Sequence, residues 1–442
     1  MYKIGMISLG CPKNQVDAEL MLAKLEQAGF EIVNDAFGAD AVIINTCGFI
    51  EDAKREAIEN ILEMAQLKED GEVKKVIVTG CLAQRYQQEV IEEIPEIDSI
   101  IGIGANENIA QICKDTIEGK SIIDFPPKEE LPLNGQRLLT TPQHWAYLKI
   151  AEGCSNCCTY CAIPKIRGRF RSRAMEDIIE EANALAQSGV KEIVVVAQDT
   201  TRYGLDIYDK LMLPTLLDKL CEIDGIEWIR LLYCYPDFLS DELIDTIAKQ
   251  EKVLKYIDLP LQHADSKVLK MMNRTGSRQE LTQLISKIRN RIPDVVIRTT
   301  FITGFPGETA QSFENLAEFV KEIKFDRLGC FAYSAEEGTP AAEFENQVDE
   351  GEKNHRGELI MQAQYDIFMD SNEQCIGKTF KVITEGYDAY SDSYHGRSYR
   401  DAPDIDSRVF FTCQNALQNG DFVDVQILGV KEYDLLGKAI EK

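Results

Sequence analysis

Four cysteines fall within the eight residues from Cys154 to Cys161, a loop that reads Cys-Ser-Asn-Cys-Cys-Thr-Tyr-Cys. A loop this dense in thiols favours a soft metal centre over disulfides. With Cys154, Cys158 and Cys161 as ligands, the spacing is C-x3-C-x2-C. Three thiolates on a cubane of four irons leave one iron open to a small molecule. The spacing therefore predicts a catalytic iron–sulfur site.

Two C-x2-C pairs, Cys154/Cys157 and Cys158/Cys161, are the alternative reading and would hold zinc. The pairs of a structural zinc site are usually separated by a longer segment, and back-to-back pairs would crowd four sulfurs onto one turn. We therefore favour the cluster and interpret Cys157 as a bystander that could complicate its assembly.

Three further cysteines occupy equivalent places in the N-terminal third of the chain. Cys11, Cys47 and Cys81 each follow a predicted strand within one to three residues and have a glycine beside them. Neighbouring strand ends lie about 4.8 Å apart, so three thiols can converge there. Three ligands again predict a cluster with an open iron. The alternative is three unrelated core thiols, which is how we interpret Cys113 inside a helical pattern.

The elements that would position Cys11, Cys47 and Cys81 alternate along residues 1–125, the first predicted domain. Apolar runs and helical periodicity place strands at Ile4–Leu9, Ala41–Asn45 and Lys75–Thr79, and helices at Val16–Phe30, Ala53–Leu67, Gln84–Ile94 and Glu107–Glu118. Such alternation predicts a doubly wound parallel α/β sheet, whose sites lie beyond the carboxyl ends of its strands.

After a proline-containing linker, residues 140–370 form the second predicted domain, with six strand–helix units. Its expected strands are Trp145–Ala151, Glu192–Ala197, Glu227–Leu232, Tyr256–Pro260, Val295–Thr303 and Arg327–Ala332. Helical patterns lie near 174–188, 213–223, 240–250, 265–290 and 309–323. Six units fall short of a full eight-unit barrel, but the same logic places the site at the strands' carboxyl ends, where the 154–161 loop follows the first strand.

The third predicted domain, residues 375–442, follows a helix at Glu352–Asn372. Short strands are expected at Lys378–Glu385, Val409–Thr412, Phe422–Leu428 and Asp434–Ile440, which suggests a small, OB-like β-barrel. Residues 376–442 carry 8 Lys and Arg against 11 Asp and Glu. A phosphate-gripping surface needs the opposite balance, so RNA binding is not favoured.

Composition limits the partners and the compartment. The net charge of −26 argues against a polyanion as main partner and suits a basic one. Thirteen cysteines without an export signal imply a reducing compartment, so we expect a cytoplasmic protein. No apolar run reaches the roughly 18 residues that cross a bilayer, and no membrane is expected.

These motifs resemble known enzymes. The C-x3-C-x2-C loop, with Tyr160 before the last cysteine, is similar to that of the radical S-adenosylmethionine (SAM) enzymes. The segments Leu9–Asn14, Asn45–Phe49 and Thr79–Leu82 look like the N-terminal domain of the methylthiotransferases, a radical SAM family with an auxiliary cluster. The resemblance implies two [4Fe-4S] clusters, SAM, a TIM-like partial (β/α)6 barrel and a C-terminal TRAM domain. It also implies that the auxiliary cluster holds, or gives up, the inserted sulfur.

The same resemblance implies a set of SAM contacts. Gln198 and Asp199 depart from the Gly-Gly-Glu common in radical SAM enzymes but resemble the methylthiotransferase version, which contacts the amino acid part of SAM. Gly304 and Glu308, in a Gly-Phe-Pro-Gly-Glu turn, resemble the adenosine-contacting turn. For Asp199 the simpler role is capping the next helix.

Two more residues complete the expected cofactor-binding set. Tyr160 lies in the cluster loop, and Arg173 ends the basic run Lys165–Arg173, whose guanidinium groups suit the carboxylate of SAM or of an acidic substrate. His263 follows the fourth strand of the barrel, but a lone histidine is more often a hydrogen-bonded structural residue.

The stretch Gly396–Asp406 resembles the methylthiotransferase branch that modifies small-subunit ribosomal protein twelve. This implies replacement of a C–H bond on an aspartate β-carbon by C–SCH3. No general base removes such a hydrogen, whereas a 5′-deoxyadenosyl radical can, with electrons from a donor such as flavodoxin or ferredoxin. Asp401, Asp404 and Asp406 are expected to meet the basic substrate protein.

Two other functions stay open at this point. The tRNA methylthiotransferases, which modify C2 of N6-isopentenyladenosine, share every cluster cysteine, so only the acidic charge and the 396–406 stretch favour a protein substrate. A non-catalytic iron–sulfur electron carrier is the third possibility. It is disfavoured because electron transfer has no use for two open irons.

Overall fold

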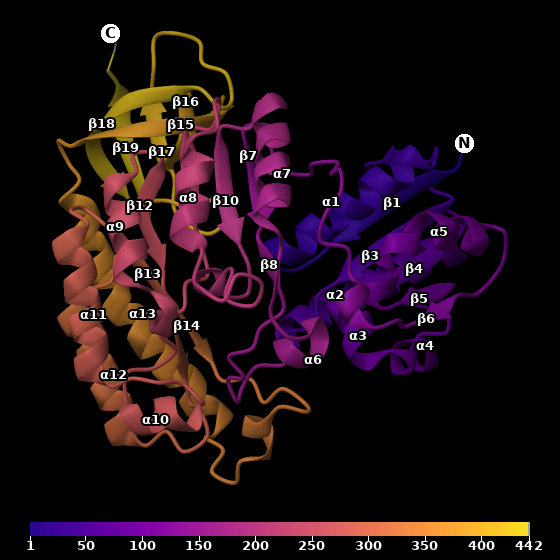
Figure 1. The fold of residues 1–442 in the computed structure, drawn as a ribbon, viewed down its shortest axis with the longest axis horizontal. Helices are drawn as coiled ribbons and strands as arrows, with labels where there is room; N and C mark the ends of the chain where they lie inside the picture. Colours follow the sequence, from indigo (N-terminus) through magenta and orange to yellow (C-terminus); the bar gives the residue numbers. More distant parts are fainter. Residues whose placement is uncertain (441–442) are drawn as a thin grey trace.

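The computed structural model describes residues 1–440, which form three main sheets in chain order (Figure 1). The first two are parallel and six-stranded, and the third is a closed five-stranded barrel. The expected fold class, with a doubly wound sheet, an incomplete barrel and a small β-barrel, is confirmed.

The N-terminal sheet is buried on both faces. Its strands are β1 (Lys3–Ser8), β2 (Glu31–Val33), β3 (Ala41–Thr46), β4 (Val76–Gly80), β5 (Ser99–Ile101) and β6 (Ile123–Asp124), in the order β2-β1-β3-β4-β5-β6. Its helices are α1 (Pro12–Gln27), α2 (Glu51–Glu69), α3 (Cys81–Tyr86), α4 (Gln88–Glu93) and α5 (Ile109–Ile117), with a 3-10 turn at Ile103–Asn108. Residues of α1 and α5 pack on one face of the sheet and those of α2 and α3 on the other, so every residue of β3 is buried.

The central sheet has the order β14-β13-β12-β11-β10-β7, and its two edge strands do not pair with each other. Its strands are β7 (Trp145–Lys149), β10 (Glu192–Val196), β11 (Trp228–Leu231), β12 (Val253–Asp258), β13 (Val296–Thr303) and β14 (Arg327–Ala332), with a small antiparallel pair β8 (Ala151–Glu152) and β9 (Arg171–Ser172). The barrel is therefore open on one side, between β7 and β14.

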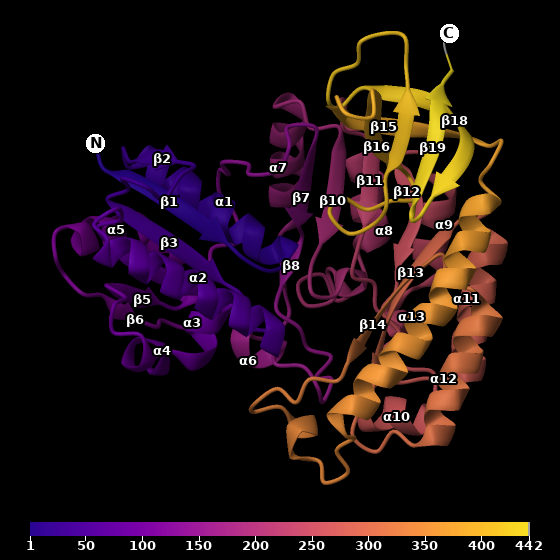
Figure 2. The same ribbon diagram turned by 180° about the vertical axis from the view of Figure 1, so that it is seen from behind.

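The helices of the central domain are α6 (Ile163–Arg167), α7 (Met175–Gln187), α8 (Leu213–Cys221), α9 (Asp241–Lys249), α10 (Ser266–Met271), α11 (Arg278–Arg291), α12 (Ala310–Ile323) and α13 (Glu350–Glu373). The longer ones, α7, α8, α9, α11, α12 and α13, cover the outside of its sheet, whereas α6 lies beside α3 of the N-terminal unit (Figure 2). The single helix expected at 265–290 is two, because Asn273, with φ 56°, and Gly276, with φ 107°, interrupt it. Among residues 1–440, none of the helices has the length and apolar character needed to cross a bilayer.

The N-terminal unit docks beside β7. Val16 and Leu20 of α1 share one hydrophobic cluster with Trp145 and Tyr147 of β7. Both ribbon views place α1 next to β8 and α3 next to α6 (Figures 1 and 2). Cys81, the first residue of α3, packs against Ala162 and Ile166, which follow the 154–161 loop, so the two predicted thiol sites lie on facing parts of the molecule.

The C-terminal barrel lies at the opposite, amino ends of the central strands. Its strands are β15 (Thr379–Asp388), β16 (Ser393–Ser398), β17 (Val409–Thr412), β18 (Phe422–Lys431) and β19 (Asp434–Ala439), in the order β15-β16-β17-β19-β18. Arg397 of β16 forms an ion pair of 2.7 Å with Glu192, the first residue of β10. Arg327, the first residue of β14, forms another of 2.7 Å with Asp401.

These contacts correct one expectation. Asp401 is 2% exposed and bonded to Arg327, and Asp406 accepts a hydrogen bond of 2.6 Å from the Tyr256 hydroxyl. The prediction that these two carboxylates meet a basic substrate is therefore wrong. Arginines buried at the amino ends of the strands need counter-ions, and the loop supplies them. Of the three acidic residues only Asp404 remains exposed.

The loop offers a matched pair of variants. We expect Asp401→Ala to lower the free energy of unfolding by about 3–5 kcal/mol, because Arg327 keeps its buried charge and loses its closest partner. Asp404→Ala, three residues away and exposed, should stay within about 0.5 kcal/mol of the wild type. Denaturant unfolding followed by circular dichroism measures both. Equal stability of the two variants would show that the Asp401–Arg327 pair does not anchor the C-terminal barrel.

Candidate active site

The cysteines of the N-terminal sheet meet at the carboxyl ends of three neighbouring strands. Cys11 precedes α1 after β1, Cys47 directly follows β3, and Cys81 opens α3 after β4. Electrostatic interactions couple all three thiols, and Cys47 and Cys81 are buried. A Cβ on Gly10 would lie 2.6 Å from that of Cys47, so only glycine lets these two turns touch. We call Cys11, Cys47 and Cys81 the auxiliary triad.

The second triad, Cys154, Cys158 and Cys161, lies in the loop between β8 and α6. The three thiols interact electrostatically with one another, as those of the auxiliary triad do. Cys157 is exposed, adopts φ 53°, and accepts a hydrogen bond of 3.0 Å on its carbonyl from Asn273. We call the three convergent residues the loop triad.

Neither triad is arranged for a single ion. In the described residues 1–440, no three His, Cys, Asp or Glu side chains come close enough to hold one metal ion. Zn–S bonds of about 2.3 Å would require the sulfurs to lie close together. The thiolates of a cubane bind different irons, so they stand farther apart.

Burial keeps several of these thiols protonated when no metal is bound. It raises the pKa of Cys81 to about 12 and that of Cys154 to about 11, and it raises the pKa of Cys47 and Cys161 as well. Such thiols are poor nucleophiles at neutral pH, and metal binding must displace their protons. Their chemistry suits cluster ligands better than covalent catalysis.

A buried network of four charges joins the N-terminal unit to the barrel and contacts the auxiliary triad at Cys81. Arg167 of α6 donates to the Cys81 sulfur at 3.2 Å and to the Asp17 carboxylate at 2.5 Å. Lys149 of β7 pairs with Asp17 and with Glu152, the latter at 3.0 Å. Burial would raise the pKa of Glu152, but Lys149 and Arg167 hold it well below its usual range. All four side chains are at most 2% exposed, so two carboxylates and two cations neutralise each other between the N-terminal unit and the barrel.

The predicted SAM contacts after β10 are held next to the loop triad. Asp199 accepts hydrogen bonds from Asn156, inside the cysteine loop, at 2.9 Å and from the Thr201 hydroxyl at 2.6 Å. Its side chain makes no capping bond to the following 3-10 turn, contrary to the simpler role considered above. Burial raises the pKa of Asp199. Gln198 donates to Glu152 at 2.5 Å, which ties this strand end to the buried network.

Glu308 was expected to contact SAM, but its carboxylate bonds to other residues of the protein. Its carboxylate is fully buried and is bonded to the backbone N–H of Gly304 at 3.1 Å, to Arg356 at 2.6 Å and to His263 at 3.1 Å. His263 also accepts from the backbone of Asp265, so both ring nitrogens are engaged. These residues brace the Gly304–Glu308 turn, where a Cβ on Gly304 would lie 2.1 Å from Lys353.

Arg173 also differs from expectation. Its guanidinium is 2% exposed and bonded to Glu181, to Asn134 and to the carbonyl of Lys149. These partners engage Nε and Nη1 of Arg173 and connect it to α7, so its charge is matched inside the protein by Glu181.

Tyr160 remains beside the loop triad, where its hydroxyl lies 3.4 Å from Arg274. Arg274 is a residue that sequence reasoning missed. Its guanidinium lies 3.8 Å from the Cys158 sulfur and 4.3 Å from the centre of the Tyr235 ring. It comes from the loop after α10, more than a hundred residues from the cysteines, and nothing in its local sequence marks it.

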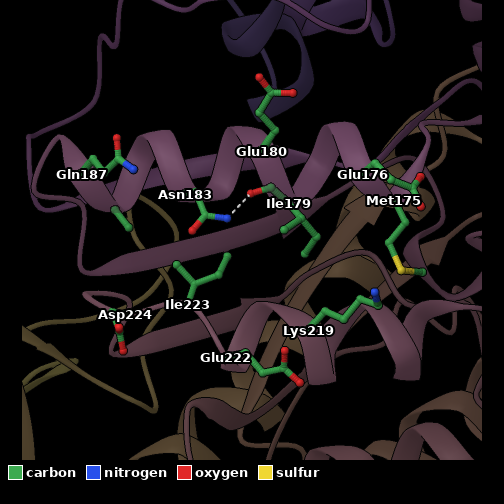
Figure 3. A pocket seen from close by; sticks show the side chains of 11 residues that line it. Met175, Glu176, Ile179, Glu180, Asn183, Gln187, Lys219, Glu222, Ile223 and Asp224 are labelled. Carbon is green, nitrogen blue, oxygen red and sulfur yellow. Dashed lines mark hydrogen bonds between the residues drawn. The ribbon is translucent and has the colours of Figure 1, made fainter.

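Two cavities lie away from both triads. A groove of about 690 Å³ runs between α7 and α8 on the outside of the barrel and is lined by Glu176, Glu180, Lys219 and Glu222, among others (Figure 3). It contains none of the cysteines. A second cavity, of about 500 Å³, lies where α3 and α6 meet and includes Arg85 and Lys165. Neither cavity contains a residue of either triad.

The chain matches three family models and several full-length relatives. The models are "Uncharacterized protein family UPF0004" at residues 3–102, "Radical SAM superfamily" at 148–320 and "TRAM domain" at 376–440. The "Ribosomal protein uS12 methylthiotransferase RimO" of Thermoanaerobacter sp. (strain X514) is 50% identical over 99% of this chain and 100% of its own length. The protein of the same name from Clostridioides difficile (strain 630) is 49% identical over 100% and 99%. The chain belongs to the RimO family.

Solved structures with a similar fold are more distant from this RimO family member. The radical SAM methyltransferase TsrM of Kitasatospora setae, solved with cobalamin and a [4Fe-4S] cluster, has a TM-score of 0.58 and 13% identity, over 86% of this chain and 81% of its own. At this identity the likeness concerns the fold alone.

Membership of the RimO family and of the radical SAM superfamily implies two [4Fe-4S] clusters and SAM as cofactors. The donor sets fit them. Each triad offers three convergent thiols, and each has a buried guanidinium beside one sulfur, Arg167 at Cys81 and Arg274 at Cys158. Buried cations at this distance suit the negative charge of a thiolate-bound cluster.

Arg167 can be tested against a close neighbour in the sequence. In Arg167→Met, Cys81 loses its donor and Asp17 and Glu152 lose a buried cation, so we expect a loss of about 3–5 kcal/mol in stability. Retention of iron by the auxiliary triad should fall with it. Arg169→Met, two residues along and exposed, is the control. Iron per chain after chelator challenge, together with thermal unfolding, measures the difference. If both variants kept iron equally, the network would not support the auxiliary triad.

Proposed function

We propose that this chain is a methylthiotransferase that installs a methylthio group on the β-carbon of an aspartate of ribosomal protein uS12. The full-length similarity to RimO proteins supports this function. The observation that carries it in this molecule is the pair of facing thiol triads, each with three ligands and each therefore able to leave one iron open.

In this proposal Cys154, Cys158 and Cys161 hold the SAM-binding cluster, and Cys11, Cys47 and Cys81 hold the auxiliary cluster. When bound, these groups supply the radical that opens the C–H bond and the sulfur that is installed. The residues of the chain supply position and exclude side reactions.

We propose Asp199, Gln198 and Tyr160 as the residues that orient SAM next to the loop triad. Asn156 and Thr201 hold the Asp199 carboxylate in one orientation, in which it suits the ammonium of SAM. Gly304 allows the close approach of the adenosine turn to α13, and Glu308 fixes that turn from behind. For Arg173 we propose a supporting role only.

We further propose a division of the chain into residues 1–125 with the auxiliary cluster, 140–370 as the radical SAM core and 375–442 as the TRAM domain. The electrons would come from a small donor such as flavodoxin or ferredoxin, and the reaction would take place in the cytoplasm, where ribosomal proteins are found. RNA is not proposed as a partner, because residues 376–442 carry more acidic than basic side chains.

An iron count tests the two ligand sets. After anaerobic reconstitution the wild type should hold about eight irons per chain, and the Cys11/Cys47/Cys81 triple alanine variant about four, since each triad binds one four-iron cluster. Cys157→Ala, in the same loop as the second triad, should keep about eight. A triple variant that still held about eight irons would contradict the auxiliary site.

A direct comparison of substrates tests the activity itself. The reduced, reconstituted protein should transfer a methylthio group to a uS12 peptide that contains the target aspartate, detected by mass spectrometry, and should leave purified tRNA unmodified. Activity on tRNA alone would replace the proposed substrate. Failure to cleave SAM at all would favour an electron carrier.

A further inference from the structure

Lys13 is a buried cation of unusual surroundings. It lies on α1 two residues after Cys11, the residue is 6% exposed, and its Nζ lies 3.4 Å from the centre of the Tyr233 ring. Within residues 1–440 its ammonium forms no ion pair with a carboxylate. The neighbouring buried cations Lys149 and Arg167, by contrast, both pair with Asp17 and Glu152.

The positive charge of Lys13 is thus left without a paired negative charge. A buried ammonium without a paired counter-ion is unfavourable, and the Tyr233 side chain and the unpaired, more distant charge of Glu152 offset only part of that cost. The carboxylates of the network already neutralise two other cations. Lys13 therefore has the character of a site for an anion, which is either the thiolate-bound cluster at Cys11 or a carboxylate that arrives from outside.

The position of Lys13 indicates which anion. Cys11 interacts with it electrostatically, so it stands beside the auxiliary triad. Tyr233 belongs to the barrel, where it follows β11 at the carboxyl end of the strands. Its carbonyl accepts a hydrogen bond of 3.0 Å from the backbone N–H of Thr200, the residue after Asp199. The contact between Lys13 and Tyr233 thus bridges the sulfur-bearing side and the proposed SAM side, where the reacting carbon must lie.

We propose that Lys13 binds the side-chain carboxylate of the substrate aspartate, an inference that rests on the proposed function. The β-carbon is bonded directly to that carboxyl carbon, so an ion pair at Nζ holds the reacting carbon between the two triads. The ion pair also selects aspartate, because an asparagine in the same place presents no charge to the ammonium. Lys13 is thereby a substrate-binding and specificity residue.

SAM also carries a carboxylate, so the experiment must distinguish binding of the substrate carboxylate from binding of the SAM carboxylate. Reconstituted wild type, Lys13→Met and Lys13→Arg are compared with Lys24→Met, a lysine on the same helix that pairs with Glu107 at 2.5 Å. Fluorescence anisotropy measures the affinity of labelled uS12 peptides with Asp or Asn at the target position, without reductant so that nothing turns over. Iron and sulfide content, SAM affinity and the EPR spectra of the reduced clusters are measured on the same samples.

For Lys13→Met we expect the Asp peptide to bind about 100-fold more weakly and the Asn peptide to bind as it does to the wild type. Iron content, SAM affinity and EPR spectra should be those of the wild type. Lys13→Arg should retain part of the preference for Asp, and Lys24→Met all of it.

Four outcomes overturn the inference. Weaker SAM binding in Lys13→Met would assign the residue to the cofactor's carboxylate, and loss of iron or an altered EPR spectrum would assign it to the auxiliary cluster. An unchanged ratio of Asp to Asn affinity would remove it from substrate recognition. A wild type that neither binds nor modifies the Asp peptide, yet cleaves SAM, identifies failure of the proposed substrate itself, and the inference falls with it.

Discussion

The structure depends on a small set of opposite charges enclosed between its first two units. Asp17 comes from α1, Lys149 and Glu152 from the first strands of the barrel, and Arg167 from α6. Lys149 and Arg167 both pair with Glu152 inside the barrel, but they meet Asp17 only when the N-terminal sheet is docked, and Asp17 has no other cation in the network. Because a buried charge without its partner is costly, the network favours one relative orientation of the two units.

The relative orientation of the two units also positions residues of the proposed active site. Arg167 reaches past Asp17 to the Cys81 sulfur, so the same guanidinium that aligns the units also contacts a proposed cluster ligand. Gln198 connects Glu152 to the strand end that carries Asp199. Docking, the auxiliary triad and the proposed SAM contacts are therefore parts of one continuous hydrogen-bonded system, and a change at any member is expected to affect the others.

Sequence reasoning succeeded where a local pattern carried the information. Cysteines at equivalent strand ends, such as Cys47 after β3 and Cys81 after β4, predicted their own convergence, because parallel strands end at one edge of a sheet. The strands β2, β5 and β6, of only two or three residues, were missed because so short a segment shows no periodicity. The helix expected at Gln84–Ile94 is divided at Gln87, whose φ of 50° has no signature in composition.

Pairing between distant residues could not be predicted in the same way. Charge pattern marked Asp401 and Asp406 as available for a partner, but Arg327 and Tyr256 use them inside the molecule. Arg173 was expected to meet SAM and instead holds Glu181, while Arg274 and Lys13 gained their significance only from contacts with Cys158 and Tyr233. The type of a residue shows which groups it can bind. Only the fold shows whether its side chain is already bonded inside the molecule or is available to a ligand.

The attachment of the C-terminal barrel has a consequence for how a large substrate approaches. Asp401 and Asp406 bond to arginine and tyrosine side chains at the amino ends of the central strands. These bonds hold the C-terminal barrel in one position relative to the central domain. The outer surface of the C-terminal barrel and the two thiol triads are separated by the fixed length of the central strands. A substrate protein that contacts both must therefore have two surfaces separated by that same distance. The rigid central domain thus limits which proteins can bind at both places at once.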